Sequence, residues 1–124
     1  MSFASILQKI VDECGGGLAA ALMGSDGIPI EQVEVSAESG QLLNDEVGVL
    51  GVEFGRILEE MRKASDSVGG GALEEVSVRL ASFWVLMRMV DEETYLILAI
   101  APDGNAGKAR FLMRRHLLAL RDEL

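Results

Sequence analysis

The sequence is poor in the side chains from which most catalytic and metal centres are built. Cys14 is its only cysteine and His116 its only histidine. One cysteine excludes an intramolecular disulfide, and the two side chains are too few for a Cys/His zinc site. A hydrolase dyad would require them to meet in the fold, and because nothing around Cys14 resembles an activated thiol, a buried apolar cysteine is favoured. We therefore predict a non-enzymatic protein without metal or cofactor.

Long hydrophobic runs and aromatic side chains are also scarce. The longest apolar stretches, "LAAALM" at 18–23 and "LILAIA" at 96–101, are far shorter than the ~20 residues that span a bilayer. The start "MSFASILQKI" lacks the features of a signal peptide, so we expect a cytoplasmic protein with no membrane insertion. Because 49% of the residues are hydrophobic and only 5% aromatic, we expect one domain over 1–124 with a core of aliphatic residues and Met.

Positive charge is in the minority. The chain has 11 Lys and Arg against 20 Asp and Glu, a net charge of −9, which repels nucleic acid and anionic lipid. Residues 108–124 hold five basic and two acidic side chains, a balance of +3, which leaves −12 for the remainder. This basic end could steer a partner, but a solvated polar helix face is the favoured interpretation.

The first third of the chain predicts a helix followed by a β-hairpin. Apolar residues recur at three- and four-residue steps over 3–14, between a serine that can cap the helix and a glycine that can end it. Two apolar runs then flank a tight-turn signal at 25–27. The first run is apolar on both faces and predicts an interior strand. The second contains Pro29 and changes phase near Glu31, which predicts an edge strand with a bulge.

A second helix is predicted from about Asp45 to Ser67. Its broad apolar stripe should cover a sheet and consists of Val47, Leu50, Phe54, Ile57, Leu58 and Met61. Gly48, Gly51 and Gly55 fall together beside this stripe, and three glycines cost a helix roughly 2 to 3 kcal/mol relative to alanine. Close approach of another backbone should offset that cost. The approaching partner is either the chain's own sheet or the helix of a second copy.

The remainder predicts three strands and a last helix. Residues 76–80 alternate between apolar and polar, 83–90 follow a turn at Ala81-Ser82, and 94–101 read as a fully buried central strand. The final helix runs from Ala106 to the end. The order helix-strand-strand-helix-strand-strand-strand-helix predicts an α+β sandwich, an antiparallel sheet with helices on both faces.

The segment "APDGNAGKAR" at 101–110 joins the central strand to the last helix. A Walker-type phosphate loop would need a glycine at Pro102 and a Ser or Thr at Ala109. Without that hydroxyl there is no Mg²⁺ ligand, so a plain strand-to-helix connector is favoured.

This order of elements, with "LMGSDGIPI" in the first hairpin and "AIAPDGNAGKARFLMRR" entering the last helix, resembles the Roadblock/dynein light chain family, and most of all its bacterial MglB-type branch. The resemblance covers nearly the whole chain. It implies a profilin-like, five-stranded antiparallel sheet with the first and third helices on one face and the second on the other. It also implies that 101–110 is a structural connector, with Asn105 as the helix cap.

The resemblance further implies a homodimer, because family members pair through the second helix and the third strand. The sequence agrees at two places: an amphipathic strand with a bare edge, and a glycine stripe that lets two helices approach across a twofold axis. The predicted interface residues are Gly48, Gly51, Val52, Gly55, Val76, Val78 and Leu80. On this hypothesis, replacing Gly51 with Leu weakens association.

Members of this branch bind small Ras-like GTPases and stimulate GTP hydrolysis without donating an arginine, so the resemblance implies a non-enzymatic GTPase-binding dimer. The surface it implies lies on the second helix and consists of Val49, Val52, Glu53, Arg56 and Glu60. The acidic residues at 59–60 depart from the branch and bear on activation more than on binding. The alternatives are an assembly subunit of a polarity or motility complex without GTPase contact, and a small-ligand sensor with a pocket between sheet and helix.

Overall fold

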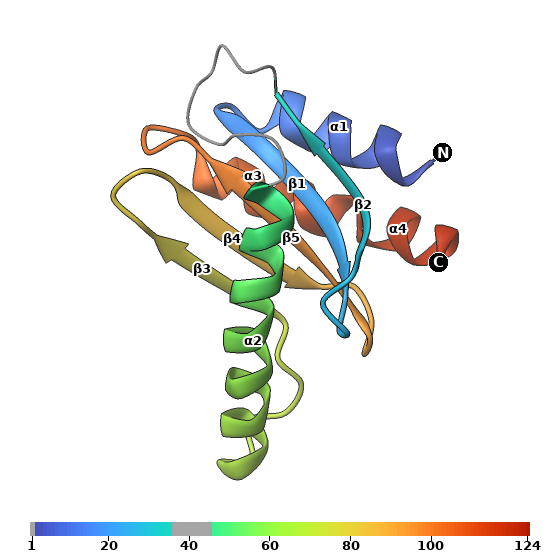
Figure 1. Cartoon of the computed structure of the whole chain (residues 1–124), viewed down its shortest axis with the longest axis vertical. Helices are drawn as coiled ribbons and strands as arrows, with labels where there is room; N and C mark the ends of the chain where they lie inside the picture. The colour runs from blue at the N-terminus through green and yellow to red at the C-terminus, as the bar shows by residue number, and fades with distance from the viewer. Residues whose placement is uncertain (1, 36–45) are drawn as a thin grey trace.

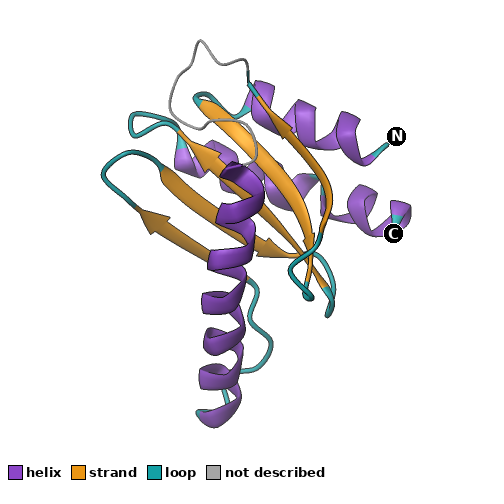
Figure 2. Ribbon diagram, viewed as in Figure 1, coloured by secondary structure: helices purple, strands orange, loops and turns teal. Residues whose placement is uncertain are grey.

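The structure is a computed structural model that describes residues 2–35 and 46–124. Its elements are α1 (Phe3–Glu13), β1 (Gly17–Gly24), β2 (Pro29–Glu34), α2 (Glu46–Ser67), β3 (Glu75–Arg79), β4 (Trp84–Met89), β5 (Thr94–Ile100), α3 (Ala106–Arg115) and α4 (Leu117–Glu123). Figure 1 shows their arrangement and Figure 2 separates helices from strands. The predicted helix start at Asp45 lies outside the described residues.

The five strands form one antiparallel sheet in the order β2-β1-β5-β4-β3. The fully buried β5 lies at its centre, as the apolar run over 94–101 predicts. β1 lies between β2 and β5 and is buried on both faces, whereas β2 and β3 are the edge strands. The predicted central strand, the edge position of the second strand and the antiparallel pairing are thus confirmed.

The first hairpin closes as its sequence predicts. Asp26 Oδ1 accepts a hydrogen bond from the Ile28 backbone N–H at 3.0 Å, and Gly27 has a φ of 85°, which suits glycine in a tight turn. The pairing passes from Leu22–Glu31 to Met23–Pro29, so one extra residue of β2, Ile30, bulges out. Pro29 therefore begins an edge strand. Because proline has no backbone N–H, this is a position where its presence does not break the hydrogen bonds of the sheet.

Two apolar layers lie on the two faces of the sheet. α1, α3 and α4 pack on one face, where Ile10, Leu98 and Leu112 belong to one buried cluster. α2 packs on the other face, where Val47 and Leu58 meet side chains from β1, β4 and β5. Because the strands alternate, neighbouring residues such as Leu96 and Ile97 serve opposite layers.

The last helix differs from its prediction. Instead of one helix from Ala106 onward, the chain forms α3 and α4 with a break at His116. The residues on either side of the break, Met113 and Leu117, are both buried against the sheet. Both short helices thus pack on the same face of the sheet as α1, which makes three helices on this face rather than two.

The connector between β5 and α3 is held by backbone contacts to the loop between α1 and β1. Asn105 caps α3 by accepting a hydrogen bond from the Lys108 N–H at 3.0 Å, as predicted. Its own N–H donates to Gly15 O at 3.1 Å, and Ala101 N–H donates to Gly16 O at 2.8 Å. These contacts give 101–105 a structural role.

Candidate functional site

The described residues contain no cluster of three or more His, Cys, Asp or Glu that could hold a metal ion. Cys14 is fully buried and its thiol donates to Val11 O at 3.6 Å, while burial raises the pKa of the thiol. A raised pKa keeps the sulfur protonated, so Cys14 is the apolar core residue that its sequence context predicts. Over the same residues, no helix is long and apolar enough to cross a membrane.

The glycine stripe of α2 faces the chain's own sheet. A Cβ on Gly51 would collide with the side chain of Met23, and one on Gly55 would collide with the hydroxyl of Tyr95. The Tyr95 hydroxyl donates to Gly51 O at 2.7 Å, a buried link between β5 and α2. Of the two partners that the sequence left open, the chain's own sheet thus occupies the space at Gly51 and Gly55.

This placement changes what a substitution at Gly51 reports. A leucine there would displace Met23 from the core beneath α2, so weaker association of a Gly51→Leu variant would follow from damage to the fold. The missing side chain at Gly51 has a sufficient cause within one chain. A helix contact with a second copy must therefore use another face of α2.

Such a face exists on the flank of α2 next to the glycines. Leu50 and Phe54 are half-buried there, and one or two turns further on Ile57 is 45% and Met61 37% exposed. The sheet covers the start of this apolar flank and leaves its continuation open, because the last turns of α2 project beyond the sheet (Figure 1). We call Leu50, Phe54, Ile57 and Met61 the apolar flank of α2.

β3 adds a second open apolar surface. One of its edges pairs with β4, and no strand within 2–35 or 46–124 pairs with the other. Val76 and Val78 are half-buried and pack beside the α2-side cluster, yet α2 itself packs on β1 and β2. On this side of the sheet, β3 extends past α2 (Figure 1), whereas Val85 and Met87 of β4 are buried in the α2-side cluster. Leu80 lies at the end of the same surface.

The opposite side of β3 is polar and occupied. Arg110 of α3 donates through Nε to Ser77 Oγ at 3.1 Å, and Arg88 of β4 pairs with Glu75 at 3.3 Å. These links fix α3 and β4 to the polar face of the edge strand. The two faces of β3 thus differ as the alternation over 76–80 predicts.

The predicted partner-binding residues lie on the outward side of α2. Val49 is 61% and Val52 37% exposed, and Glu53 pairs with Arg56 at 2.5 Å on the same surface. Glu60 pairs with Lys63 one turn further along. Both pairs are solvent-exposed, so each adds little to stability and remains available to a partner.

A shallow groove runs beside this surface between β2 and α2. It has a volume of about 450 Å³ and is lined by Pro29, Gln32, Gly48, Val49, Val52 and Glu53. Gly48 forms part of its wall, since a Cβ there would stand 3.2 Å from Gln32 Oε1. We call these six residues the β2–α2 groove. It contains three residues predicted for partner binding.

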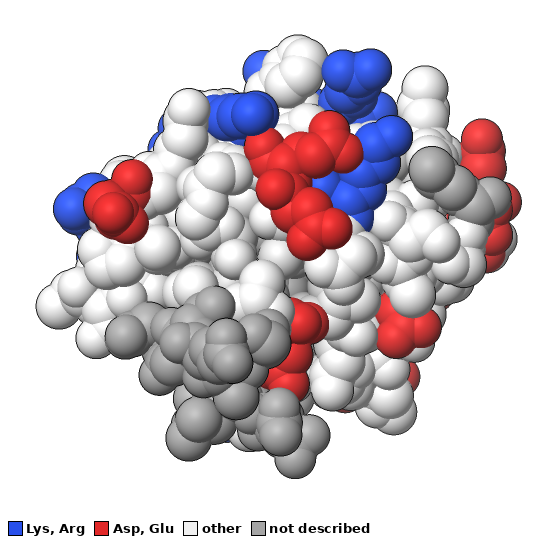
Figure 3. All heavy atoms as spheres, turned by 90° about the horizontal axis from the view of Figure 1, so that it is seen from above, with Lys and Arg blue, Asp and Glu red and all other residues white. Residues whose placement is uncertain are grey.

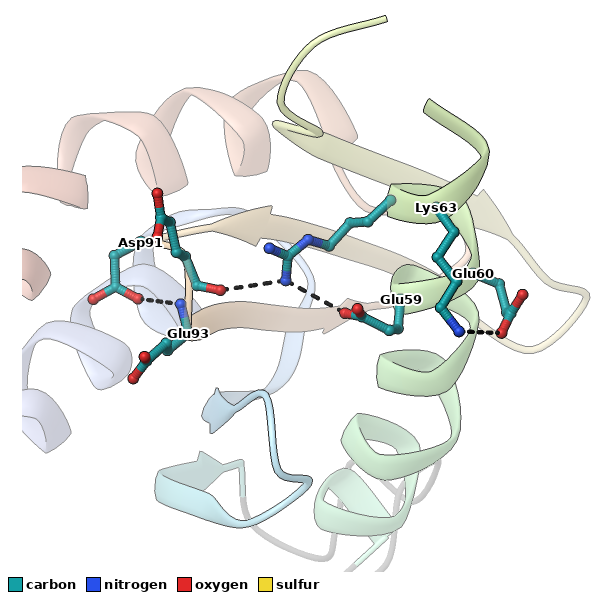
Figure 4. A network of polar contacts seen from close by, with 7 residues as sticks. Glu59, Glu60, Lys63, Asp91 and Glu93 are labelled. Carbon is teal, nitrogen blue, oxygen red and sulfur yellow. Dashed lines mark hydrogen bonds and ion pairs between the residues drawn. The ribbon is translucent and has the colours of Figure 1, made fainter. Parts of the chain in front are cut away.

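A second hollow of about 600 Å³ lies where the end of α2, the loop before β3, the end of β4 and α4 meet. Arg62 crosses it and donates to Glu92 O at 3.2 Å while it pairs with Glu59 at 3.3 Å (Figure 4). In the adjoining turn, Asp91 accepts a hydrogen bond from the Glu93 N–H at 2.8 Å. Arg62 thus ties the projecting half of α2 to the β4–β5 turn, a role that its helical spacing does not reveal.

Neither hollow lies in the interior between the sheet and its helices. Both open to solvent, and the side chains that face inward from α2 and from α1, α3 and α4 fill the two layers. This arrangement disfavours the small-ligand sensor, which requires a cavity beneath a helix.

Comparisons with solved structures agree with this fold. The chain is 34% identical to MglC from Myxococcus xanthus over the full length of both chains, with a TM-score of 0.69. A Roadblock/LC7 domain from Streptomyces avermitilis has a TM-score of 0.84 at 16% identity, over 98% of this chain and 97% of that one. The gliding protein MglB from Thermus thermophilus has a TM-score of 0.81 at 15% identity, over 94% and 84%.

The chain matches no family profile, and the comparison with curated proteins finds no match. The 34% identity to MglC over the full length of both chains, together with the shared fold, nevertheless shows the family. The chain belongs to the Roadblock/LC7 family, in the branch of the Mgl proteins. The structures at 15–16% identity contribute the fold alone.

Proposed function

We propose that this chain is a homodimeric regulator without catalytic activity of its own, which binds a small Ras-like GTPase in the cytoplasm as part of a gliding or polarity system. Its family and its similarity to Mgl proteins support the regulatory role. A platform that works by contact needs exposed adhesive surfaces rather than tuned catalytic groups. α2 and β3 provide such surfaces.

The observation that carries the proposal is the half-buried apolar side of the edge strand β3 next to the apolar flank of α2. Two copies related by a twofold axis could pair their β3 edges and extend the sheet across the axis, and each would bring Val76 and Val78 to the same contact. The exposed Ile57 and Met61 of each copy would then lie over the shared sheet. Pairing would also remove the aggregation hazard of a free edge.

For the GTPase, we assign the outward side of α2 beside the β2–α2 groove. Val49 and Val52 supply apolar contact area there, and Glu53 with Arg56 supplies charges of both signs. This surface lies away from β3, so it would stay open after two copies pair. The glycines contribute indirectly, because they let α2 lie close to the sheet.

The proposal is tested by titrating a small Ras-like GTPase from the same genome, loaded with GDP or with a non-hydrolysable GTP analogue, into the purified chain. We expect calorimetry to detect binding that prefers one nucleotide state. Val49→Glu should weaken that binding about tenfold, or about 1.4 kcal/mol, because it places a charge at the apolar contact.

The matched control is Val68→Glu, which adds the same charge at an 82% exposed valine near the end of α2. Its affinity should equal that of the unmodified chain. Absence of binding in both nucleotide states would instead favour an assembly subunit that makes no GTPase contact.

A further inference from the structure

We propose that copies of this chain also associate head to tail, with a ridge on α3 and α4 of one copy seated in the β2–α2 groove of the next. The ridge consists of Phe111, Arg114, Arg115 and Leu118. The contact does not use the β3 edge, but its groove shares Val49, Val52 and Glu53 with the surface proposed for the GTPase, so the two occupants would compete.

The ridge is an apolar and cationic surface on the outside of the molecule. Phe111 is 51% and Leu118 68% exposed, while Leu112 and Leu117 beside them are buried against the sheet. Arg114 and Arg115 are exposed between the two apolar side chains. An exposed aromatic flanked by arginines is the composition enriched at the centre of protein contacts.

The arginines of the ridge differ from the other arginines of α3 and α4. Arg110 donates to Ser77 and Arg121 to Val90 O, so both hold these helices to the sheet. Over the part of the chain that the structure describes, the side chains of Arg114 and Arg115 make no hydrogen bond or ion pair. They are therefore available to carboxylates outside the chain.

The β2–α2 groove offers the ridge apolar walls and one carboxylate. Gly48 leaves out a side chain on the wall of the groove that faces Gln32, and Pro29, Val49 and Val52 give it apolar walls that suit Phe111. Glu53 stands at its rim, where an incoming arginine can share its carboxylate with Arg56. Seen from above, the basic side chains in view gather toward one side of the molecule, whereas acidic ones are spread over it (Figure 3).

Charge favours a second copy over a membrane or a nucleic acid as the occupant of the ridge. The balance of +3 over 108–124 faces −12 on the rest of every other copy. The same −12 repels phosphate surfaces. Ridge and groove lie on opposite faces of the sheet, so one copy cannot satisfy both, and the contact must be heterologous.

The test uses three proteins that all carry Val78→Lys, which places a charge in the proposed twofold contact so that β3 pairing does not contribute. One has no other change. The ridge variant adds Phe111→Ser with Arg114→Glu, and the groove variant adds Gly48→Leu, whose side chain would fill the groove. Thermal unfolding followed by circular dichroism checks that all three are folded.

Sedimentation velocity should show concentration-dependent association of the first protein that weakens as salt is raised, and at least a tenfold loss of association in each variant alone. An equimolar mixture of the two variants should form a one-to-one complex, because one member keeps its groove and the other keeps its ridge. Only a heterologous contact gives this rescue.

A first protein that stays monomeric, variants that associate as strongly as it does, or a mixture without complex would overturn the proposal. Binding of the first protein, but not of the ridge variant, to vesicles of anionic phospholipid in the absence of self-association would overturn it as well. That result would assign the ridge to a lipid surface.

Discussion

At the scale of single residues, glycines do opposite things in this fold. A Cβ on Gly17 would collide with the backbone carbonyl of Val11, where the end of α1 packs on the start of β1. A Cβ on Gly107 would meet nothing closer than Asn105 Oδ1 at 3.5 Å, in the first turn of α3. The same residue type is therefore required at one position and merely tolerated at the other.

Gly17→Ala should destabilise the protein by about 2 kcal/mol or more, because backbone atoms cannot move aside as a flexible side chain can. Gly107→Ala should stabilise it by up to about 1 kcal/mol through helix propensity. Urea unfolding of both variants beside the unmodified chain measures the two effects. Equal changes of one sign would show that the close approach of α1 to β1 is misplaced.

A single residue, His116, also makes the stability of the fold depend on pH. Burial lowers the pKa of its imidazole first, and the nearby Lys9 and Arg115 lower it further. In the unfolded chain the pKa returns to about 6.5, so the unfolded state binds the proton more readily. The contribution of neutral His116 to the free energy of unfolding is therefore complete above a pH of about 6.5, and it is lost as the pH falls through the lower pKa of the folded chain.

We therefore expect the free energy of unfolding to fall between pH 7 and about 5.5, and to fall less in His116→Asn. Urea titrations at the two pH values measure the difference. An equal loss of unfolding free energy between the two pH values in both proteins would mean that the imidazole takes up its proton equally well in the folded and unfolded chains.

At the scale of elements, α2 divides into two parts. Its first half lies on β1 and β2, where Tyr95 and Met23 fit against its glycines. Its last turns project beyond the sheet (Figure 1), and Arg62 ties them to the β4–β5 turn. The projecting half carries Met61, so its position decides where the apolar flank of α2 meets another molecule.

Arg62→Ala should loosen this projecting half. We expect faster hydrogen–deuterium exchange of amides over 59–68, because the link to Glu92 O is lost. Arg56→Ala is the matched control, since among the described residues the Arg56 side chain pairs only with the exposed Glu53 on the same helix. Equal exchange in the two variants would remove Arg62 from its positioning role.

At the scale of the whole molecule, the proposed twofold dimer makes stability depend on concentration. The melting temperature should rise as the protein is concentrated, since pairing stabilises only the folded chain. At concentrations too low for head-to-tail association, Val78→Lys should abolish that rise and halve the mass measured by light scattering, whereas Val68→Lys at the tip of α2 should do neither. A single mass at all concentrations, equal in both variants, would contradict the dimer.

How much the sequence could predict differed between the strands and the site. Strand order near β5 and the edge position of β2 followed from burial on both faces and from Pro29, which are local signals. The break at His116 did not, because the apolar spacing continues through it. The role of Arg62 was equally hidden, since its partner Glu92 is 30 residues away.

The sequence by itself determined the elements, their order, the antiparallel sheet, the caps and the family, because hydrophobic period, turn residues and helix caps act over a few neighbouring residues. It also identified α2 as the surface to examine. Only the tertiary structure decided what the glycines of α2 touch. From the sequence, either the chain's own sheet or the helix of a second copy could lie against these glycines. The structure decides for the sheet, because Met23 and Tyr95 from distant strands occupy the space beside them.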